Sequence, residues 1–351
     1  MAQAAVSINT AIHCGVIVAA QGVRGFACYS SYGRGRPSAA FQRTSAGPNR
    51  ECSDLLRFPP TMTLDNSSAS GTSVLKRLRE DRPLVAVELR PPRSGMSYAE
   101  SVDAWIDMYH SIRRLARQDT LIFLTDNAVG RSEEENLAHL TANLAGELPA
   151  ERLVPFLTCK HSLEYIQLYA ARAASHGFEA LTVVGGDQAT GTARIVPHAY
   201  QLRRMMRGWV PRLNLGGWIN PHRDAERQVD FLLDRDFEAD YYVTQIVSHH
   251  HLDQVERFLA ESRRRGVPFP GVFGVFLYRS ANPRTLRQLG DFFPVPVEGV
   301  TRDFEAGLAP EAIVAKTICA LREIGVDKIY VSNLGFDRPD ARYRRILELI
   351  S

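Results

Sequence analysis

Apolar runs and stretches with helical periodicity alternate along the chain from about residue 73 to the C-terminus. Short runs of aliphatic and β-branched residues predict eight buried strands, at 84–89, 120–125, 153–158, 180–186, 213–219, 241–246, 271–277 and 328–333. Apolar positions spaced by three and four residues predict helices, at 74–79, 98–117, 132–145, 162–176, 198–207, 224–235, 252–265, 283–289, 310–324 and 341–350. The segment 292–299 is predicted to be a loop.

This order of elements indicates the fold. Buried strands that alternate with helices pair in parallel. Eight such units in about 270 residues match a (β/α)8 TIM barrel in number and length. An open doubly wound sheet is the alternative, but no GxGxxG turn between a strand and a helix supports it. We therefore predict an α/β protein with a single (β/α)8 barrel, formed by residues 71–351 as the catalytic domain.

The first 70 residues differ from the rest because they show no persistent period. They are rich in Ala, Gly, Ser and Arg, and Glu51 is their first acidic residue. That composition is typical of an organellar transit peptide. A second interpretation is that translation starts at Met62. Both interpretations predict that residues 1–70 are disordered and lie outside the barrel.

Composition and charge exclude several classes of protein. The 351 residues are 45% hydrophobic and 23% charged, as in ordinary globular proteins. Residues 1–50 contain five arginines and no acidic residue. Residues 51–351 therefore contain 37 basic and 39 acidic side chains, which gives them a net charge of −2. That balance predicts no nucleic-acid partner. No apolar run is long enough to span a membrane, and the five cysteines lack metal or disulfide spacing. We expect a cytoplasmic protein.

Polar side chains stand where the predicted strands end. In a barrel these ends form the face that carries the active site. Singly, residues such as Asp126 and Asp187 suit helix caps. Together they predict a polar pocket, formed by Glu88, Thr125, Asp126, Thr158, Gly186, Asp187, Asn220, Gln245, Tyr278 and Asn333.

Glu88 is the most informative of these residues. It follows the apolar run 84–87 and precedes the prolines that close the strand. A carboxyl group at the end of a buried strand keeps its proton to higher pH than a free one, as a general acid requires. The alternative is a simple ion pair with Arg90 or Arg93.

Other rim positions have a functional and a structural interpretation each. Gly185 and Gly186 would let a flat or charged ligand approach the backbone, or only form a tight turn. Gln245 suits the edge of a heterocycle, and Tyr278 would stack on an aromatic ligand or cover the barrel mouth. The run 249–251, three histidines, predicts a polar loop and no metal site, because neighbouring side chains do not share a helix face and no acid is well placed.

Five segments in order resemble the methylenetetrahydrofolate reductase family. They span residues 84 to about 336. Segment 87–92 looks like the family's strand-one motif of a glutamate among aromatic residues before two prolines. The others look like its His-Leu-Thr-Cys, its strand ending in Arg-Gly-Asp, its Thr-Gln and its Pro-Gly-Ile, at 156–159, 180–187, 244–245 and 270–272.

The resemblance implies a barrel that binds FAD, takes hydride from NAD(P)H and reduces 5,10-methylenetetrahydrofolate to 5-methyltetrahydrofolate, a step of one-carbon metabolism and methionine biosynthesis. Its partners are then a reduced folate and a nicotinamide nucleotide. Barrels of this family commonly associate as homo-oligomers. Carried over, Glu88 is the general acid and Asp187 lies near flavin and pterin, with folate contacts at Gln245 and Tyr278 and flavin contacts at Thr125, Asp126, Gly185, Gly186, Trp218 and His222.

Three departures from the family pattern all concern the flavin. Gly185 replaces the arginine of Arg-Gly-Asp, 125–128 departs from Thr-Tyr-Gly-Ala, and a lysine that meets the flavin phosphates falls near Asp234, beside Arg235. Loss of cations weakens the binding of a pyrophosphate. Three alternatives therefore stay open: direct hydride transfer without flavin, a folate barrel that moves a methyl group, and a folate-binding module without turnover.

Overall fold

The computed structural model describes residues 73–126, 136–137, 139–140, 150–186 and 192–351. Eight parallel strands close into one barrel in the order β1 to β8, with β8 paired to β1. The strands are β1 (Leu84–Leu89), β2 (Ile122–Leu124), β3 (Leu153–Thr158), β4 (Ala180–Val184), β5 (Asn214–Ile219), β6 (Tyr241–Val247), β7 (Gly271–Phe276) and β8 (Lys328–Ser332). The predicted (β/α)8 fold is confirmed.

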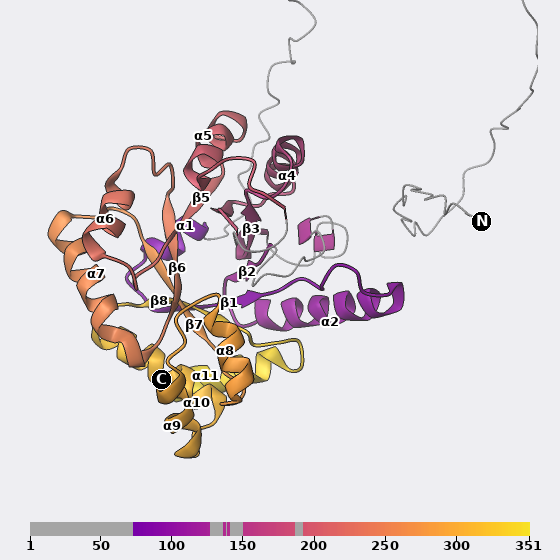
Figure 1. The fold of residues 1–351 in the computed structure, drawn as a ribbon. Helices are drawn as coiled ribbons and strands as arrows, with labels where there is room; N and C mark the ends of the chain where they lie inside the picture. The colour runs from indigo at the N-terminus through magenta and orange to yellow at the C-terminus, as the bar shows by residue number, and fades with distance from the viewer. Residues whose placement is uncertain (1–72, 127–135, 138, 141–149, 187–191) are drawn as a thin grey trace, which may run out of the picture. The chain divides into compact units, whose positions relative to one another are not determined.

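Helices surround the barrel as an outer ring (Figure 1). They are α2 (Tyr98–Ala116), α4 (Leu163–Ser175), α5 (Ala199–Trp209), α6 (Ala225–Leu233), α7 (Leu252–Arg265), α8 (Pro283–Gly290), α9 (Val297–Glu305), α10 (Pro310–Glu323) and α11 (Pro339–Ile350), with single 3-10 turns η3 (Ala150–Arg152) and η4 (His249–His251). Most of the predicted helix 132–145 lies outside the described residues.

Two predicted loops contain helical structure. The segment expected as a loop at 292–299 runs into helix α9, and the expected polar loop of three histidines is the 3-10 turn η4. Pro296 stands at the N-cap of α9, and Gly299 lies within its first turn. Proline is tolerated at a helix start. Both segments matter below because they face each other.

Alternating side chains divide between two apolar cores. In β1, Val85, Val87 and Leu89 pack outward against the helices. Leu84 and Ala86 point into the barrel. This period of two follows from the pleat of a strand.

Two interior tyrosines fill the barrel where glycines leave room for them. A Cβ atom on Gly216 would lie 2.6 Å from the ring of Tyr241, and one on Gly274 would lie 2.4 Å from the hydroxyl of Tyr330. Tyr330 Oη donates to the carbonyl of Thr244 at 2.7 Å. Large and small residues thus interdigitate across the barrel, as dense packing requires.

Helix α1 (Val74–Arg79) covers the amino-terminal end of the barrel. Val74 and Leu78 are buried in the same core as the interior strand residues. Beside them, Lys328 Nζ donates to the carbonyls of Glu80 and Arg82, at 2.8 and 2.7 Å. The closed amino-terminal end leaves the opposite rim, where the strands end, as the place for chemistry.

Candidate functional site

Glu88 occupies the last inward-facing position of β1. The pleat that points Leu84 and Ala86 into the barrel also points Glu88 there. Ser332, at the end of the neighbouring β8, donates a hydrogen bond from Oγ to Glu88 Oε1 at 2.6 Å. Burial raises the pKa of Glu88, and the Ser332 bond and the charge of Arg90 lower it by less. The carboxyl group therefore holds its proton to higher pH than an exposed glutamate.

Asp126 connects the ends of β2 and β3. Its Oδ2 accepts hydrogen bonds from the backbone N–H and the hydroxyl of Thr158, at 2.7 and 2.9 Å. His161 Nε2 lies 2.7 Å from the same oxygen. Thr125, next to it, is buried, and its carbonyl accepts a bond from the amide of Asn136. Asp126, which was expected to contact the flavin, thus binds Thr158 and His161 at the start of the loop after β3.

The two glycines after β4 make room for cationic side chains. Gly186 has a positive φ of 79°, and a Cβ atom there would lie 3.1 Å from the side chain of Lys160. A Cβ atom on Gly185 would lie 2.6 Å from the guanidinium carbon of Arg194, which donates to the carbonyl of Gly186. Arg194 thus lies beside the position where the family's arginine is missing, and sequence reasoning did not single it out. Asp187 lies outside the described residues.

On β5 and the turn after it, one expected flavin contact is open and the other is engaged. Trp218 is 41% exposed. His222 uses both ring nitrogens, because Nδ1 lies 2.6 Å from Gln254 Oε1 and Nε2 lies 2.7 Å from the carbonyl of Ile246. Trp218 is therefore partly exposed to solvent, whereas His222 connects Gln254 to the end of β6.

Gln245 and Tyr278 also make contacts with other residues of the protein. Gln245 Nε2 donates to the carbonyl of Phe292 at 3.1 Å, and its Oε1 accepts from the N–H of Ile246 at 2.9 Å. Tyr278 is buried against Phe276, with ring centroids 5.1 Å apart, and burial raises its pKa. Its hydroxyl has no hydrogen-bond partner among the described atoms. The Tyr278 side chain is therefore part of the inner apolar core of the barrel.

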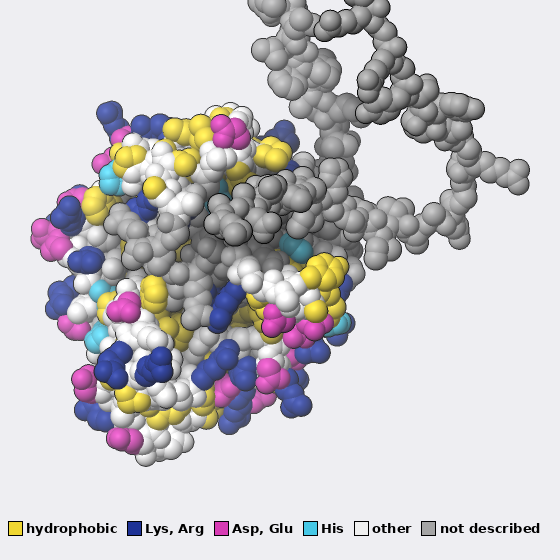
Figure 2. Space-filling model, turned by 45° about the vertical axis from the view of Figure 1, so that its right-hand side comes forward, with side chains coloured by type: hydrophobic (Ala, Val, Ile, Leu, Met, Phe, Trp, Pro, Cys, Tyr) yellow, Lys and Arg dark blue, Asp and Glu magenta, His cyan; other side chains and the backbone are white. Residues whose placement is uncertain are grey.

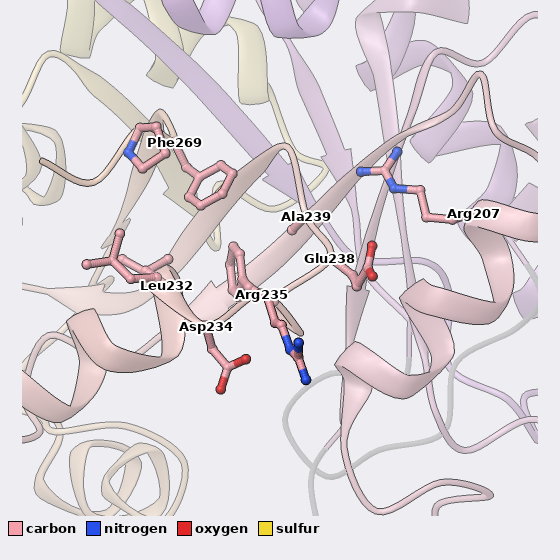
Figure 3. A pocket seen from close by; sticks show the side chains of 10 residues that line it. Arg207, Leu232, Asp234, Arg235, Glu238, Ala239 and Phe269 are labelled. Atoms are coloured by element: carbon pink, nitrogen blue, oxygen red, sulfur yellow. The ribbon is translucent and has the colours of Figure 1, made fainter.

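Two cavities lie at the opposite end of the barrel. One of about 320 Å³ is lined by residues around the starts of β6 and β7, including Arg207, Phe237, Glu238 and Phe269 (Figure 3). Asp234 and Arg235 line it too, at the C-terminal end of α6. A second of about 190 Å³ lies near the start of β1. Asp234 and Arg235, near which the family's lysine falls, therefore lie at the end of the barrel that faces away from the rim.

An acidic residue that the sequence analysis did not single out lies beside the three histidines. Asp303 on α9 lies within ion-pair distance of both His249 and His250. The statement that no acid is well placed there was wrong, because the chain brings in Asp303 from more than 50 residues away. No local spacing signals such a contact.

The surface shows mixed charge. On the face in Figure 2, Lys and Arg side chains are interspersed with Asp and Glu. Among the residues that the structure describes, no helix is both long and apolar enough to cross a membrane.

The comparisons with known proteins show the fold. No family model and no curated protein matches the chain. A protein from Clostridium thermocellum, described as binding two copies of 5-methyl-5,6,7,8-tetrahydrofolic acid, superposes with a TM-score of 0.55 at 15% identity, over 79% of this chain and 98% of its own.

Two structures of tryptophan synthase from M. tuberculosis are also similar. The aminoacrylate-bound form has a TM-score of 0.44 at 14% identity, over 77% of this chain and 94% of its own. The open form with BRD0059 bound has a TM-score of 0.45 at 13% identity, over 80% and 99%. Both scores are too low to argue from.

Proposed function

We propose that this barrel reduces 5,10-methylenetetrahydrofolate to 5-methyltetrahydrofolate, with NAD(P)H as the source of hydride. The observation that carries the proposal is Glu88. It is a partly buried residue on the inner face of the barrel at the strand end, and desolvation raises the pKa of its carboxyl group. Binding alone does not need a buried acid, whereas this reaction does.

The chemistry asks for one proton and one hydride. As the five-membered ring of the folate opens, the departing nitrogen takes a proton from Glu88. The methylene carbon is left as an iminium ion, and hydride adds to it. No nucleophilic side chain is required. A carboxyl group whose pKa is raised by burial can supply the proton near neutral pH.

A folate as ligand has support from two sides. The Clostridium thermocellum protein, which shares the fold, is described as binding 5-methyl-5,6,7,8-tetrahydrofolic acid, the chemical product of the proposed reaction. The five motif segments of the reductase family also fall on this chain in order. Asp187, Gln245 and Tyr278 are the proposed pterin and folate contacts. Gln245 and Tyr278 would have to exchange internal contacts for the ligand.

FAD fits the described residues poorly. When bound, a flavin relays hydride from the nicotinamide to the folate. Among its expected contacts, His222 has both nitrogens engaged and Asp126 holds Thr158 and His161. Trp218 is 41% exposed, and the guanidinium group of Arg194 lies near Gly185. This balance favours direct transfer from NAD(P)H, and FAD as a carrier is the second form of the same proposal.

Glu88→Gln tests the assignment of the acid. The amide keeps the shape and can still accept from Ser332, but it has no proton of suitable acidity to give. We expect kcat for NAD(P)H oxidation with methylenetetrahydrofolate to fall about 100- to 10,000-fold, as is usual for the loss of a general acid. Folate affinity, measured by calorimetry, should change by only a few fold.

Glu256→Gln is the matched control, because Glu256 is exposed on α7 and lies in no proposed contact. Its kcat should equal that of the unchanged protein. Unchanged turnover in Glu88→Gln would remove Glu88 from the mechanism. Folate binding with no NAD(P)H oxidation in the unchanged protein would favour a methyl-transferring or purely binding barrel.

An absorbance spectrum separates the two hydride routes. The purified protein would be mixed with excess FAD, desalted and scanned in the visible range. We expect no retained flavin band and persistent NAD(P)H oxidation, because the described rim offers few free flavin contacts. A retained band together with turnover that depends on it would establish FAD as the carrier and overturn direct transfer.

A further inference from the structure

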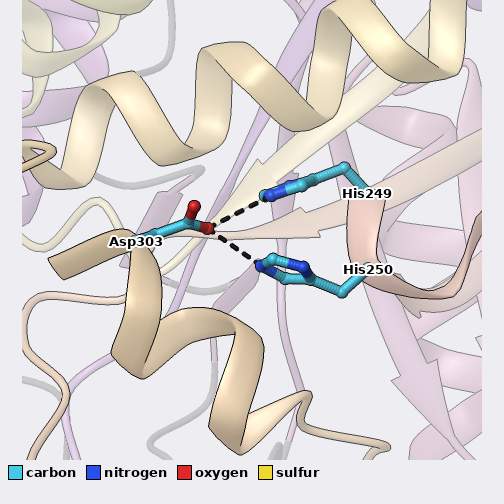
Figure 4. A group of neighbouring side chains, drawn as sticks. All are labelled: His249, His250 and Asp303. Carbon is cyan, nitrogen blue, oxygen red and sulfur yellow. Dashed lines mark hydrogen bonds and ion pairs between the residues drawn. The ribbon is translucent and has the colours of Figure 1, made fainter. Parts of the chain in front are cut away.

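A cluster of two histidines and one aspartate lies outside the proposed folate site. His249 and His250 form η4, directly after β6, and Asp303 lies on α9 across from them (Figure 4). Asp303 Oδ2 lies 3.1 Å from His249 Nε2 and 2.9 Å from His250 Nε2. The three potential ligand atoms all lie within 4.8 Å of one another. Donor atoms from two separate segments thus converge on one point.

The other ring nitrogen of His249, Nδ1, lies beside the hydroxyl of Thr317. Thr317 Oγ1 donates to the carbonyl of Ile313 at 3.1 Å, as a hydroxyl on a helix commonly does. It lies 2.7 Å from His249 Nδ1, and it accepts the proton of that nitrogen in the tautomer that carries hydrogen on Nδ1. A hydroxyl has only one proton to give. In the neutral ring, Nε2 then carries a lone pair.

That lone pair faces the carboxylate of Asp303. His249 Nε2 is buried and has no hydrogen-bond partner among the described atoms. Its 3.1 Å contact with Asp303 Oδ2 lacks the geometry of a hydrogen bond. Both side chains are only 7% exposed. In that tautomer, a cation between these two electron-rich atoms would stabilise both of them away from water.

The surroundings hold the other two ligands in place. Lys316 Nζ lies 2.9 Å from Asp303 Oδ1, which leaves Oδ2 to face the histidines. A Cβ atom on Gly299 would lie 2.6 Å from the ring of His250, so the glycine makes room for that ring. Thr317 therefore orients His249, and Lys316 orients Asp303. Hydrogen-bonding partners outside the coordination sphere orient metal ligands in the same way.

The geometry points to a site for one first-row divalent cation, bound by His249 Nε2, His250 Nε2 and Asp303 Oδ2, with Zn²⁺ as the matching ion. Tetrahedral zinc with bonds of about 2.0–2.2 Å holds its ligand atoms roughly 3.3 Å apart. The observed 3.1 and 2.9 Å need only a small expansion. Two imidazoles and one carboxylate leave a fourth position for water or a small ligand.

Such an ion would tie the end of β6 to α9. Gln245, at the end of the same strand, already bonds to the carbonyl of Phe292 in the segment before α9. The ion would therefore brace the part of the rim that carries Gln245. The inference does not depend on the folate reaction.

The test is a Zn²⁺ titration of the full chain after removal of metals with a chelator. Calorimetry should show one equivalent of high-affinity binding, and Co²⁺ in its place should give the intense visible spectrum of a tetrahedral site. Asp303→Asn and His250→Gln should lose that equivalent. Thr317→Val should keep it with affinity reduced about 10- to 100-fold, since it alters only an outer partner.

His251→Gln is the matched control, because it changes the next histidine of η4 and leaves the cluster intact. It should bind like the unchanged protein. Zn²⁺ should also raise the melting temperature of the unchanged protein and of His251→Gln, but not of His250→Gln. If Asp303→Asn fails to fold, His250→Gln carries the test. Equal Zn²⁺ binding by the unchanged protein and His250→Gln, or no binding by either, would overturn the site.

Discussion

At the residue scale, the protein depends on a few polar groups inside an apolar barrel. Within the described part of the chain, Glu88 accepts one hydrogen bond, from Ser332, that offsets the loss of water around its carboxylate. One such bond does not compensate for burying a charge. Burial therefore shifts the pKa of Glu88 upward, which is the direction that a general acid needs.

This preference should appear in the pH dependence of stability. Because the pKa of folded Glu88 lies above the ordinary 4.5, the folded protein binds this proton more tightly than the unfolded chain. The resulting stability is complete below pH 4.5 and is lost as the pH rises through the folded-state pKa. Glu88→Gln removes the titration, so its stability relative to the unchanged protein should rise with pH across that window.

Urea unfolding from pH 4 upward measures this difference. Glu256→Gln, on the exposed face of α7, is the control, and it should show no such rise. A stability difference for Glu88→Gln that stays flat or falls with pH would mean that the carboxyl group is not held protonated by burial.

At the element scale, matched pairs of glycine and tyrosine determine how the strands pack. Gly274 on β7 faces Tyr330 on β8, and Gly216 on β5 faces Tyr241 on β6. The bulky ring of one strand fills the space that its neighbour leaves. Sequence periodicity predicted these strands well but did not show which glycine serves which ring.

Gly274→Ala should therefore destabilise the barrel. Its Cβ would meet the Tyr330 hydroxyl at 2.4 Å and disturb the bond to Thr244. Overpacking of this kind costs about 1–3 kcal/mol of unfolding free energy. The measurement is urea unfolding at neutral pH.

Gly208→Ala is the matched control on helix α5. It has open space around its Cβ position, so alanine should stabilise the helix by about 0.5–1 kcal/mol. If both substitutions shift the unfolding midpoint in the same direction, the close contact between Gly274 and Tyr330 does not limit the packing.

At the scale of the whole molecule, closure of the barrel separates two ends with different roles. The amino-terminal end is covered by α1 and contains both described cavities. The carboxyl-terminal end gathers Glu88, Asp126, Trp218 and Gln245, each from a different strand or its end. Residues 127–135 and 187–191, which follow β2 and β4 in the sequence, lie outside the described residues, and the second range begins with the proposed Asp187.

The sequence by itself determined the eight strands, most of the helices and the position of Glu88 at the end of β1. These features depend on local periodicity, which is written in consecutive residues. The tertiary structure decided the partners. Asp303 reaches His249 and His250 across more than 50 residues, Arg194 fills the space beside Gly185, and both nitrogens of His222 are engaged. Such contacts arise from barrel closure and the folding of long connections, so no local spacing encodes them.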